Sequence, residues 1–390
     1  MKIIQKLIVI TLIINILIGA KSAFAQTGNI DYPDILSEAA IVIDAKTGDI
    51  LFSKNSDERL YPASITKIVT AILAIESGEL DSIVTVSKHA REVDGTRVYL
   101  EEGEEVPLKK LIQGLLINSG NDAGVAIAEH LDHSVQSFAS RMNEFVSKEL
   151  GLVNTNFENP HGLFGENHYS TAFDFAMITK YALQNETFKE IIGTSELEWK
   201  GEAWKTTLYN HHSMLREWPY DGIIGGKNGY IDQSGHTLVT AAQRDGMTLI
   251  AVVLKADTKR MIYQDTENLL DFGFNHFETI DYTDSIQFQN ESDKLKYKLI
   301  QPLIVTKRKG ENVEIEVNNE GNMLASGEEG RVINTYQLEK LEIAKNSVTP
   351  TKANEIKTKD GSVATWWYIF SIIIIFLASM VFIIRKRKKS

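Results

Sequence analysis

The feature that most constrains the fold is that strand-like segments stand at both ends of a helix-rich stretch. Residues 39–54 contain two apolar runs around a Lys-Thr-Gly-Asp turn, which is typical of a β-hairpin. A helix is predicted over 62–75, and helical patterns dominate residues 105–190. Three more strand-like runs lie within 221–254, and a closing helix is expected over 266–277. We therefore expect an α+β fold in which both strand groups form one antiparallel sheet against a helical layer.

The composition changes after this region. Residues 278–345 alternate between apolar and polar side chains and predict a small β-rich domain that follows a main domain of residues 33–277. Residues 346–365 are polar and have little to bury, so they are interpreted as a linker.

Apolar segments occur near both ends of the chain. Residues 1–25 combine two early lysines, a short apolar run and a terminal Ala-Phe-Ala, which favours a cleaved signal peptide over an uncleaved membrane anchor. Residues 366–384 carry no charge and would make a helix of about 28 Å, enough to cross a bilayer. Aromatic residues open this segment, and the basic tail 385–390 follows it. The sequence thus predicts a single-pass membrane protein whose main domain lies outside the cytoplasm.

Composition excludes several classes of function. The chain has no cysteine, so disulfides and thiolate metal sites are impossible. Its net charge is −11, and the predicted exterior part is more acidic still, which argues against nucleic acid as a partner. Nine histidines occur without an H-E-x-x-H pattern, so a zinc peptidase is not expected, and His161 is interpreted as a loop-structuring residue. No metal or other cofactor is predicted.

Ser64 and Lys67 stand three residues apart at the start of the first apolar helix. Positions i and i+3 share a helix face, so the lysine amine can approach the serine hydroxyl. Burial would keep that amine neutral and able to act as a base, while backbone N–H groups at the helix start could stabilise an oxyanion. Taken alone, the pattern favours the ordinary explanation of a capping serine and a lysine that extends to solvent.

Two further polar clusters have ordinary explanations when each is taken alone. Ser119 and Asn121 interrupt two helical patterns and could present polar groups to a cleft, or could simply form a helix–helix turn. Lys227 and Gly229 lie on a predicted strand, where glycine would allow a ligand to approach the backbone. An edge-strand lysine that hinders aggregation is the alternative.

Taken together, the three clusters resemble a known family. Ser-x-x-Lys, Ser-x-Asn and Lys-x-Gly in this order match the motifs of penicillin-binding proteins and class A β-lactamases. The flanking segments "RLYPASITKIVTAILAI", "LLINSGNDAGVAIAEH", "LGLVNTNFENPHGL", "NHHSML" and "LLDFGF" resemble the low-molecular-weight D-alanyl-D-alanine carboxypeptidases in particular. The resemblance covers about residues 33–277 and implies the penicillin-binding, β-lactamase-like transpeptidase fold.

The resemblance implies a role for each matching residue. Ser64 would attack the carbonyl between the two terminal D-alanines of a peptidoglycan stem peptide, and Lys67 would take its proton. Ser119 would relay a proton to the departing D-alanine. Asn121 would bind the substrate backbone and help to hold Lys67 in place. β-Lactam antibiotics would acylate the same serine.

The strand motif would bind the other end of the substrate. By the same resemblance, Lys227 would attract the terminal carboxylate, and the Tyr230 backbone N–H would join that of Ser64 in an oxyanion hole. Gly229 is expected among the substrate-binding residues, because glycine permits a close approach of the ligand backbone. Asn228 replaces the threonine that is usual in the family. Its amide can still donate a hydrogen bond, but it is longer and differently aimed, so weakened or altered carboxylate recognition is expected.

Two alternatives to an active carboxypeptidase stay open at this point. The first is a catalytically weakened peptidoglycan- or penicillin-binding protein, for which Asn228 would be the sign. The second is a β-lactamase-like hydrolase, which would need an efficient base for deacylation.

Overall fold

The computed structural model describes residues 31–282, 287–289, 296–298, 302–318, 320–328 and 331–341. The predicted signal peptide (1–25), linker (346–365), membrane helix (366–384) and basic tail (385–390) lie outside these residues. Within the described part, no helix combines the length and the apolar character that a bilayer span requires. The C-terminal membrane helix therefore stays a prediction from sequence.

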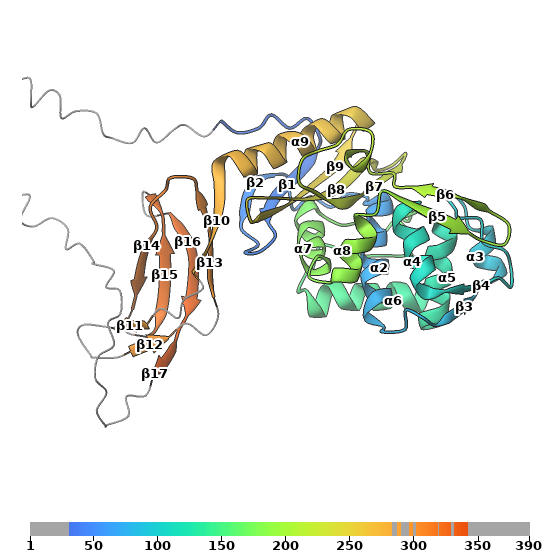
Figure 1. Cartoon of the computed structure of the whole chain (residues 1–390), viewed down its shortest axis with the longest axis horizontal. Coiled ribbons are helices and arrows are strands. Elements are labelled where there is room, and N and C mark those ends of the chain that lie inside the picture. Colours follow the sequence, from blue (N-terminus) through green and yellow to red (C-terminus); the bar gives the residue numbers. More distant parts are fainter. Residues whose placement is uncertain are drawn as a thin grey trace, which may run out of the picture. The chain divides into compact units, whose positions relative to one another are not determined.

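A five-stranded antiparallel sheet is the centre of the main domain, which confirms the predicted α+β class (Figure 1). In spatial order its strands are β2 (Ile50–Lys54), β1 (Ala39–Asp44), β9 (Met247–Ala256), β8 (Gly235–Arg244) and β7 (Ile223–Ile231). The segments predicted at both ends of the helix-rich stretch thus pair with each other, for example Ile41 with Val252. β7 is an edge strand, so one side of its backbone has no strand partner in the described structure.

Both faces of this sheet are covered, and β1 shows how the sequence achieves this. All six β1 residues are buried. Ala39, Ile41 and Ile43 belong to one hydrophobic core, whereas Ala40 and Val42 belong to the other. Because successive side chains of a strand point to opposite faces, a continuous apolar run is what a sheet buried on both sides requires.

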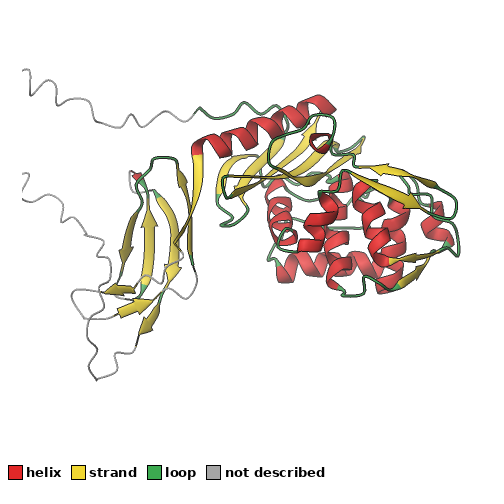
Figure 2. Cartoon of the chain, in the orientation of Figure 1, coloured by secondary structure: helices red, strands yellow, loops and turns green. Residues whose placement is uncertain are grey.

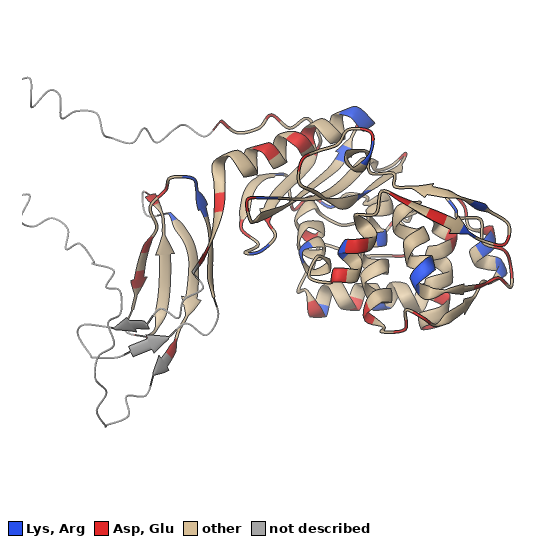
Figure 3. Ribbon diagram, in the orientation of Figure 1, with Lys and Arg blue, Asp and Glu red and all other residues tan. Residues whose placement is uncertain are grey.

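Most helices pack on one face of the sheet (Figure 2). They are α2 (Lys67–Glu76), α3 (Lys88–Glu92), α4 (Leu108–Ile117), α5 (Asn121–Asp132), α6 (Val135–Glu144), α7 (Ala172–Ala182) and α8 (Glu186–Ile192), with a short 3-10 turn at Ala63–Thr66 and a π-helical turn at Phe145–Glu149. A second 3-10 turn, Ser213–Leu215, packs on the opposite face, because Met214 belongs to the core there. Two small two-stranded sheets border this layer: β3 (Ile83–Thr85) pairs with β4 (Glu105–Pro107), and β5 (Glu196–Lys200) forms a hairpin with β6 (Lys205–Tyr209). Figure 3 shows acidic and basic positions mixed over the helical layer.

The opposite face of the sheet is covered by α9 (Lys259–His276). The predicted helix over 266–277 is correct in place but too short, because the helix begins at Lys259. Thr258 explains this start, since its hydroxyl oxygen accepts a hydrogen bond from the backbone N–H of Met261 at 3.2 Å.

Strands occupy the region after α9, as expected. β10 (Phe277–Tyr282) pairs with β13 (Leu303–Arg308), and β14 (Glu314–Val317), β15 (Asn322–Ser326) and β16 (Val332–Gln337) form a second sheet. β11 (Gln287–Gln289), β12 (Lys296–Lys298) and β17 (Glu339–Leu341) form a third. Leu303, Val305, Met323 and Ala325 make a small core of their own. The boundaries 33–277 and 278–345 stay predictions.

Candidate active site

Ser64 lies in the 3-10 turn that leads into α2, and Lys67 is the first residue of that helix. The Lys67 Nζ donates a hydrogen bond to the Ser64 Oγ at 2.9 Å. The i, i+3 spacing therefore brings the two groups together as the sequence predicted. Lys67 is fully buried, so the alternative of a lysine that extends to solvent is wrong for this structure.

The Lys67 amine makes a second hydrogen bond in addition to the one with Ser64. Its Nζ also donates to the backbone carbonyl oxygen of His161 at 2.7 Å. The loop that carries His161 is held by Asn159, whose side-chain oxygen accepts from the N–H of Gly162 at 2.7 Å and whose amide donates to the Leu163 carbonyl at 2.9 Å. His161 thus contacts Lys67 through its backbone, while its ring Nδ1 accepts from the Leu163 N–H at 3.3 Å within the same loop.

Gly162 is required where this loop meets the Ser64 turn. Its φ is +88°, and a Cβ added to it would lie 1.9 Å from the carbonyl oxygen of Ala63. Only glycine allows this approach without strain and overlap. The close contact locks the carbonyl that receives Lys67 onto the backbone that precedes Ser64.

The surroundings of Lys67 favour the neutral amine. Burial lowers the pKa of Lys67 well below its ordinary value, the nearby charge of Lys227 lowers it further, and Asp122 acts in the opposite direction. A neutral lysine within hydrogen-bond distance of a serine hydroxyl can accept its proton. The arrangement is suited to making Ser64 a nucleophile.

Ser119 and Asn121 lie in the connection between α4 and α5 and are both buried. Ser119 adopts a left-handed conformation with φ of 62°, which turns the chain sharply before α5 begins at Asn121. The Asn121 amide donates to the carbonyl oxygen of Asp94 at 2.7 Å, and its backbone N–H donates to Thr96 at 2.7 Å. Asn121 was expected to help to hold Lys67 in place. In the structure, the backbone carbonyl of His161 does so instead.

Asp122 ties a neighbouring loop to this connection. Its buried carboxylate accepts hydrogen bonds from the backbone N–H groups of Val98 at 3.0 Å and Leu100 at 3.1 Å. Burial raises the pKa of Asp122, and the backbone donors oppose that effect. The loop before residue 100 is thereby fixed to the same helix start that carries Asn121.

Lys227 and its neighbours stand on the edge strand β7. Lys227 is only 1% exposed, and burial lowers its pKa to about 7. Its Nζ donates to the backbone oxygen of Asn228 at 2.8 Å and lies 3.5 Å from the Asn228 side-chain oxygen. Because that oxygen faces Lys227, the NH2 group of Asn228 is left to donate elsewhere.

The strand runs directly beside the Ser64 backbone. A Cβ added at Gly229 would lie 2.6 Å from the Ser64 backbone nitrogen. Thr237 on β8 supports this junction, because its hydroxyl donates to the Pro62 carbonyl at 2.8 Å. The Tyr230 side chain is 55% exposed and donates to Asp232 at 3.1 Å. The structure therefore places the predicted strand cluster directly beside Ser64, while Asp122, next to Asn121, lies close enough to Lys67 to influence its pKa.

Four supporting residues were not found by sequence reasoning: Asn159, Gly162, Asp122 and Thr237. "NPHGL" contained a signal for the first two, because an Asn followed by a Gly three residues later marks a turn that needs a left-handed glycine. The Thr237 contact spans 175 residues, and no local pattern announces it. Among the described residues, no cluster of three or more potential ligands could hold a metal ion.

Comparison with known proteins agrees with this geometry. The peptidase S11 family, described as D-alanyl-D-alanine carboxypeptidase, matches residues 26–258. The chain is 35% identical over 356 residues to the D-alanyl-D-alanine carboxypeptidase DacF of Bacillus subtilis, which covers 86% of this chain and 91% of DacF. It is 36% identical to DacC of Escherichia coli, over 67% of each protein.

A solved structure gives the same result for the fold. Penicillin-binding protein 5 from Haemophilus influenzae superposes with a TM-score of 0.72 at 27% sequence identity, over 80% of this chain and 98% of that one. Motifs, site geometry, family match and fold thus agree: the chain belongs to the peptidase S11 family of D-alanyl-D-alanine carboxypeptidases, with the penicillin-binding transpeptidase fold.

Proposed function

We propose that this protein is a serine-type D-alanyl-D-alanine carboxypeptidase that removes the terminal D-alanine from peptidoglycan stem peptides. The observation that carries the proposal is the buried Lys67 amine, held between the Ser64 hydroxyl and the His161 carbonyl. The family match and the curated relatives support the same activity.

In the acylation step, the Ser64 Oγ attacks the carbonyl carbon between the two terminal D-alanines while Lys67 accepts the hydroxyl proton. The backbone N–H groups of Ser64 and Tyr230 stabilise the oxyanion. Collapse of the intermediate breaks the C–N bond, and D-alanine leaves with a proton relayed by Ser119. Water then hydrolyses the ester on Ser64 and releases the shortened peptide.

Substrate recognition follows from the free edge of β7. An extended peptide can lie along an edge strand and use its backbone groups for hydrogen bonding. Lys227 then attracts the terminal carboxylate, and the Asn228 NH2 group donates to it in place of the usual threonine hydroxyl. Asn121 binds the peptide backbone from the opposite side. β-Lactams would acylate Ser64 through the same contacts.

We further propose that the catalytic domain works outside the cytoplasm. This proposal rests on the signal-like residues 1–25 and the apolar, charge-free residues 366–384 that precede a basic tail. A carboxypeptidase in that location would meet its wall substrate directly.

Release of D-alanine from a D-Ala-D-Ala-terminated peptide tests the activity, with Ser64→Ala as the inactive control. A fluorescent penicillin separates the alternatives. A weakened binding protein would be labelled at Ser64 but would release no D-alanine, and a β-lactamase-like hydrolase would lose its label within seconds. A stable label together with D-alanine release supports the proposal.

A further inference from the structure

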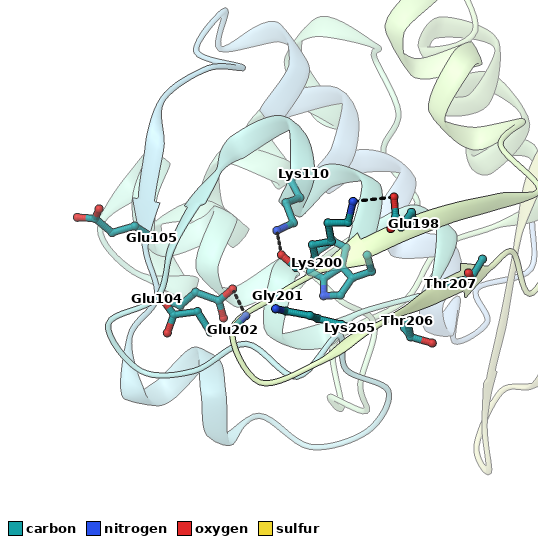
Figure 4. A pocket seen from close by; sticks show the side chains of 11 residues that line it. Glu104, Glu105, Lys110, Glu198, Lys200, Gly201, Glu202, Lys205, Thr206 and Thr207 are labelled. Carbon is teal, nitrogen blue, oxygen red and sulfur yellow. Dashed lines mark hydrogen bonds and ion pairs between the residues drawn. The ribbon is translucent and has the colours of Figure 1, made fainter.

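A groove of about 720 Å³ lies against the β5–β6 hairpin, apart from Ser64, Lys67 and Lys227 (Figure 4). It is lined by the hairpin, by Lys110 on α4, and by Glu104 and Glu105 at the start of β4. None of these residues has a role in the proposed reaction. The volume falls in the range of small-molecule sites in proteins.

The groove is built by specific contacts. Lys110 donates to the backbone oxygen of Lys200 at 2.6 Å, and its ammonium lies 4.9 Å from the centre of the Trp199 ring. Glu104 is buried and accepts from the backbone N–H of Glu202 at 3.1 Å. These contacts join α4 and the β4 region to the hairpin, so the walls of the groove are fixed relative to one another.

The charges of the groove indicate what it can bind. Four carboxylates and three ammonium groups line it, so it suits neither an anion nor a cation. Within the described residues, the side chains of Glu105, Glu202 and Lys205 form no ion pair and are exposed. Such alternating donors and acceptors match the hydroxyl groups of an uncharged, polyhydroxylated ligand.

A buried donor without a partner supports a ligand or water at this place. The Trp199 side chain is 1% exposed, and its indole N–H has no hydrogen-bond acceptor in the described structure. A Cβ added at Gly201, which also lines the groove, would lie 3.0 Å from that nitrogen. An unsatisfied buried donor costs free energy, so its presence beside a groove requires an explanation.

An aromatic pair lies at the turn of the hairpin. Trp204 lies in the turn between Glu202 and Lys205, and its ring meets that of Tyr99 edge to face at 5.0 Å. Tyr99 is 51% exposed and has φ of 58°, a left-handed conformation that is strained for an aromatic residue. Asp122, next to Asn121, holds the backbone on both sides of Tyr99. Backbone strain that is held in place by neighbouring contacts is typical of functional positions.

We propose that the hairpin groove and the Tyr99–Trp204 pair form a saccharide-binding subsite. The mixed carboxylates and lysines would bind sugar hydroxyls, and the exposed Tyr99 ring together with the partly buried Trp204 ring would pack against the apolar face of a pyranose ring. The identity of the natural ligand rests on the proposed function: it is the glycan strand that carries the stem peptides. The subsite would thus present the peptides of intact wall to Ser64.

Calorimetric titration of the full-length protein in detergent with a peptide-free β-1,4-linked N-acetylglucosamine tetrasaccharide tests the proposal. We expect saturable binding that Trp204→Ala weakens by about fivefold, in line with the loss of one aromatic contact. Lys205→Ala, a change at an exposed side chain, should weaken it as well. Trp218→Ala is the matched control, because Trp218 is 47% exposed but packs on Tyr263 instead.

Hydrolysis of a soluble D-Ala-D-Ala peptide is measured on the same variants and should not change. Absence of saturable binding, or unchanged affinity in both Trp204→Ala and Lys205→Ala, would overturn the proposal. So would competition for the groove by a sugar-free stem peptide. If the saccharide binds but no peptide is hydrolysed by the parent protein, the subsite stands and the proposed activity fails.

Discussion

Replacement of Gly162 by alanine tests whether the loop that receives Lys67 is locked onto the Ser64 turn. Gly162 has φ of +88°, and its added Cβ would lie 1.9 Å from the Ala63 carbonyl oxygen. Gly246 offers a matched control, because its φ of +81° is similar but no atom lies within 4 Å of an added Cβ. Both variants place an alanine in the left-handed conformation, which costs stability. Only Gly162→Ala also makes the new Cβ overlap a neighbouring atom.

The left-handed conformation and the steric overlap each lower stability by an amount that can be estimated. The left-handed conformation should lower the free energy of unfolding by about 1 kcal/mol in Gly246→Ala. In Gly162→Ala, the backbone must also shift to relieve the overlap, which should lower the free energy of unfolding by a further ~1–3 kcal/mol. Because the displaced atoms flank Ser64 and His161, a shift of about 1 Å should also slow acylation by roughly a hundredfold.

Urea unfolding measures the stabilities, and the rate of acylation by benzylpenicillin measures the effect on the site. We expect Gly246→Ala to acylate at the parental rate and Gly162→Ala to be both less stable and slower. Equal stabilities and equal acylation rates for the two variants would refute the locked junction.

Three other changes test separate contacts. Asn228→Thr should increase the rate of D-alanine release, because the shorter hydroxyl restores the usual donor to the carboxylate; an unchanged or lower rate would contradict this reading of Asn228. Thr237→Val removes the 2.8 Å hydrogen bond to Pro62 and should lower the free energy of unfolding by about 1 kcal/mol in urea titrations, whereas no loss would mean that this contact does not hold the turn. The value of kcat/KM for a D-Ala-D-Ala peptide should fall as the pH rises through about 7, because Lys227 loses the charge that attracts the carboxylate; a Lys227→Arg variant, charged throughout, should lack this fall.

Much of the fold could be predicted because its signals are local. The hairpin at 39–54 and the strands within 221–254 each carry their apolar pattern on a short segment. Because these two groups of strands bury their apolar faces in the same cores, they pair in one sheet, as Ile41 does with Val252. The start of α9 was missed because the helix opens on two charged residues, Lys259 and Arg260, and only the cap at Thr258 marks where it begins.

The sequence motifs predicted the reactive residues of the candidate site, but they did not predict the residues that hold these in place. Ser64 and Lys67 are three residues apart, so their contact is a property of helical geometry. The acceptor at His161 lies 94 residues from Lys67 and is a backbone carbonyl, which has no residue-type signature. Contacts of this kind arise from the packing of whole loops, so no reading of short patterns could find them.

The proposed reaction depends on a Lys67 amine that is neutral when it faces Ser64. NMR titration of lysine side chains labelled with 13C at the ε carbon measures this directly, and the signal missing from a Lys67→Arg variant identifies residue 67. We expect this signal to titrate well below the ordinary lysine value, because burial and the charge of Lys227 both lower the pKa of Lys67. Titration of Lys67 near pH 10.5 would contradict it, because the amine would then be protonated at neutral pH and unable to take the serine proton.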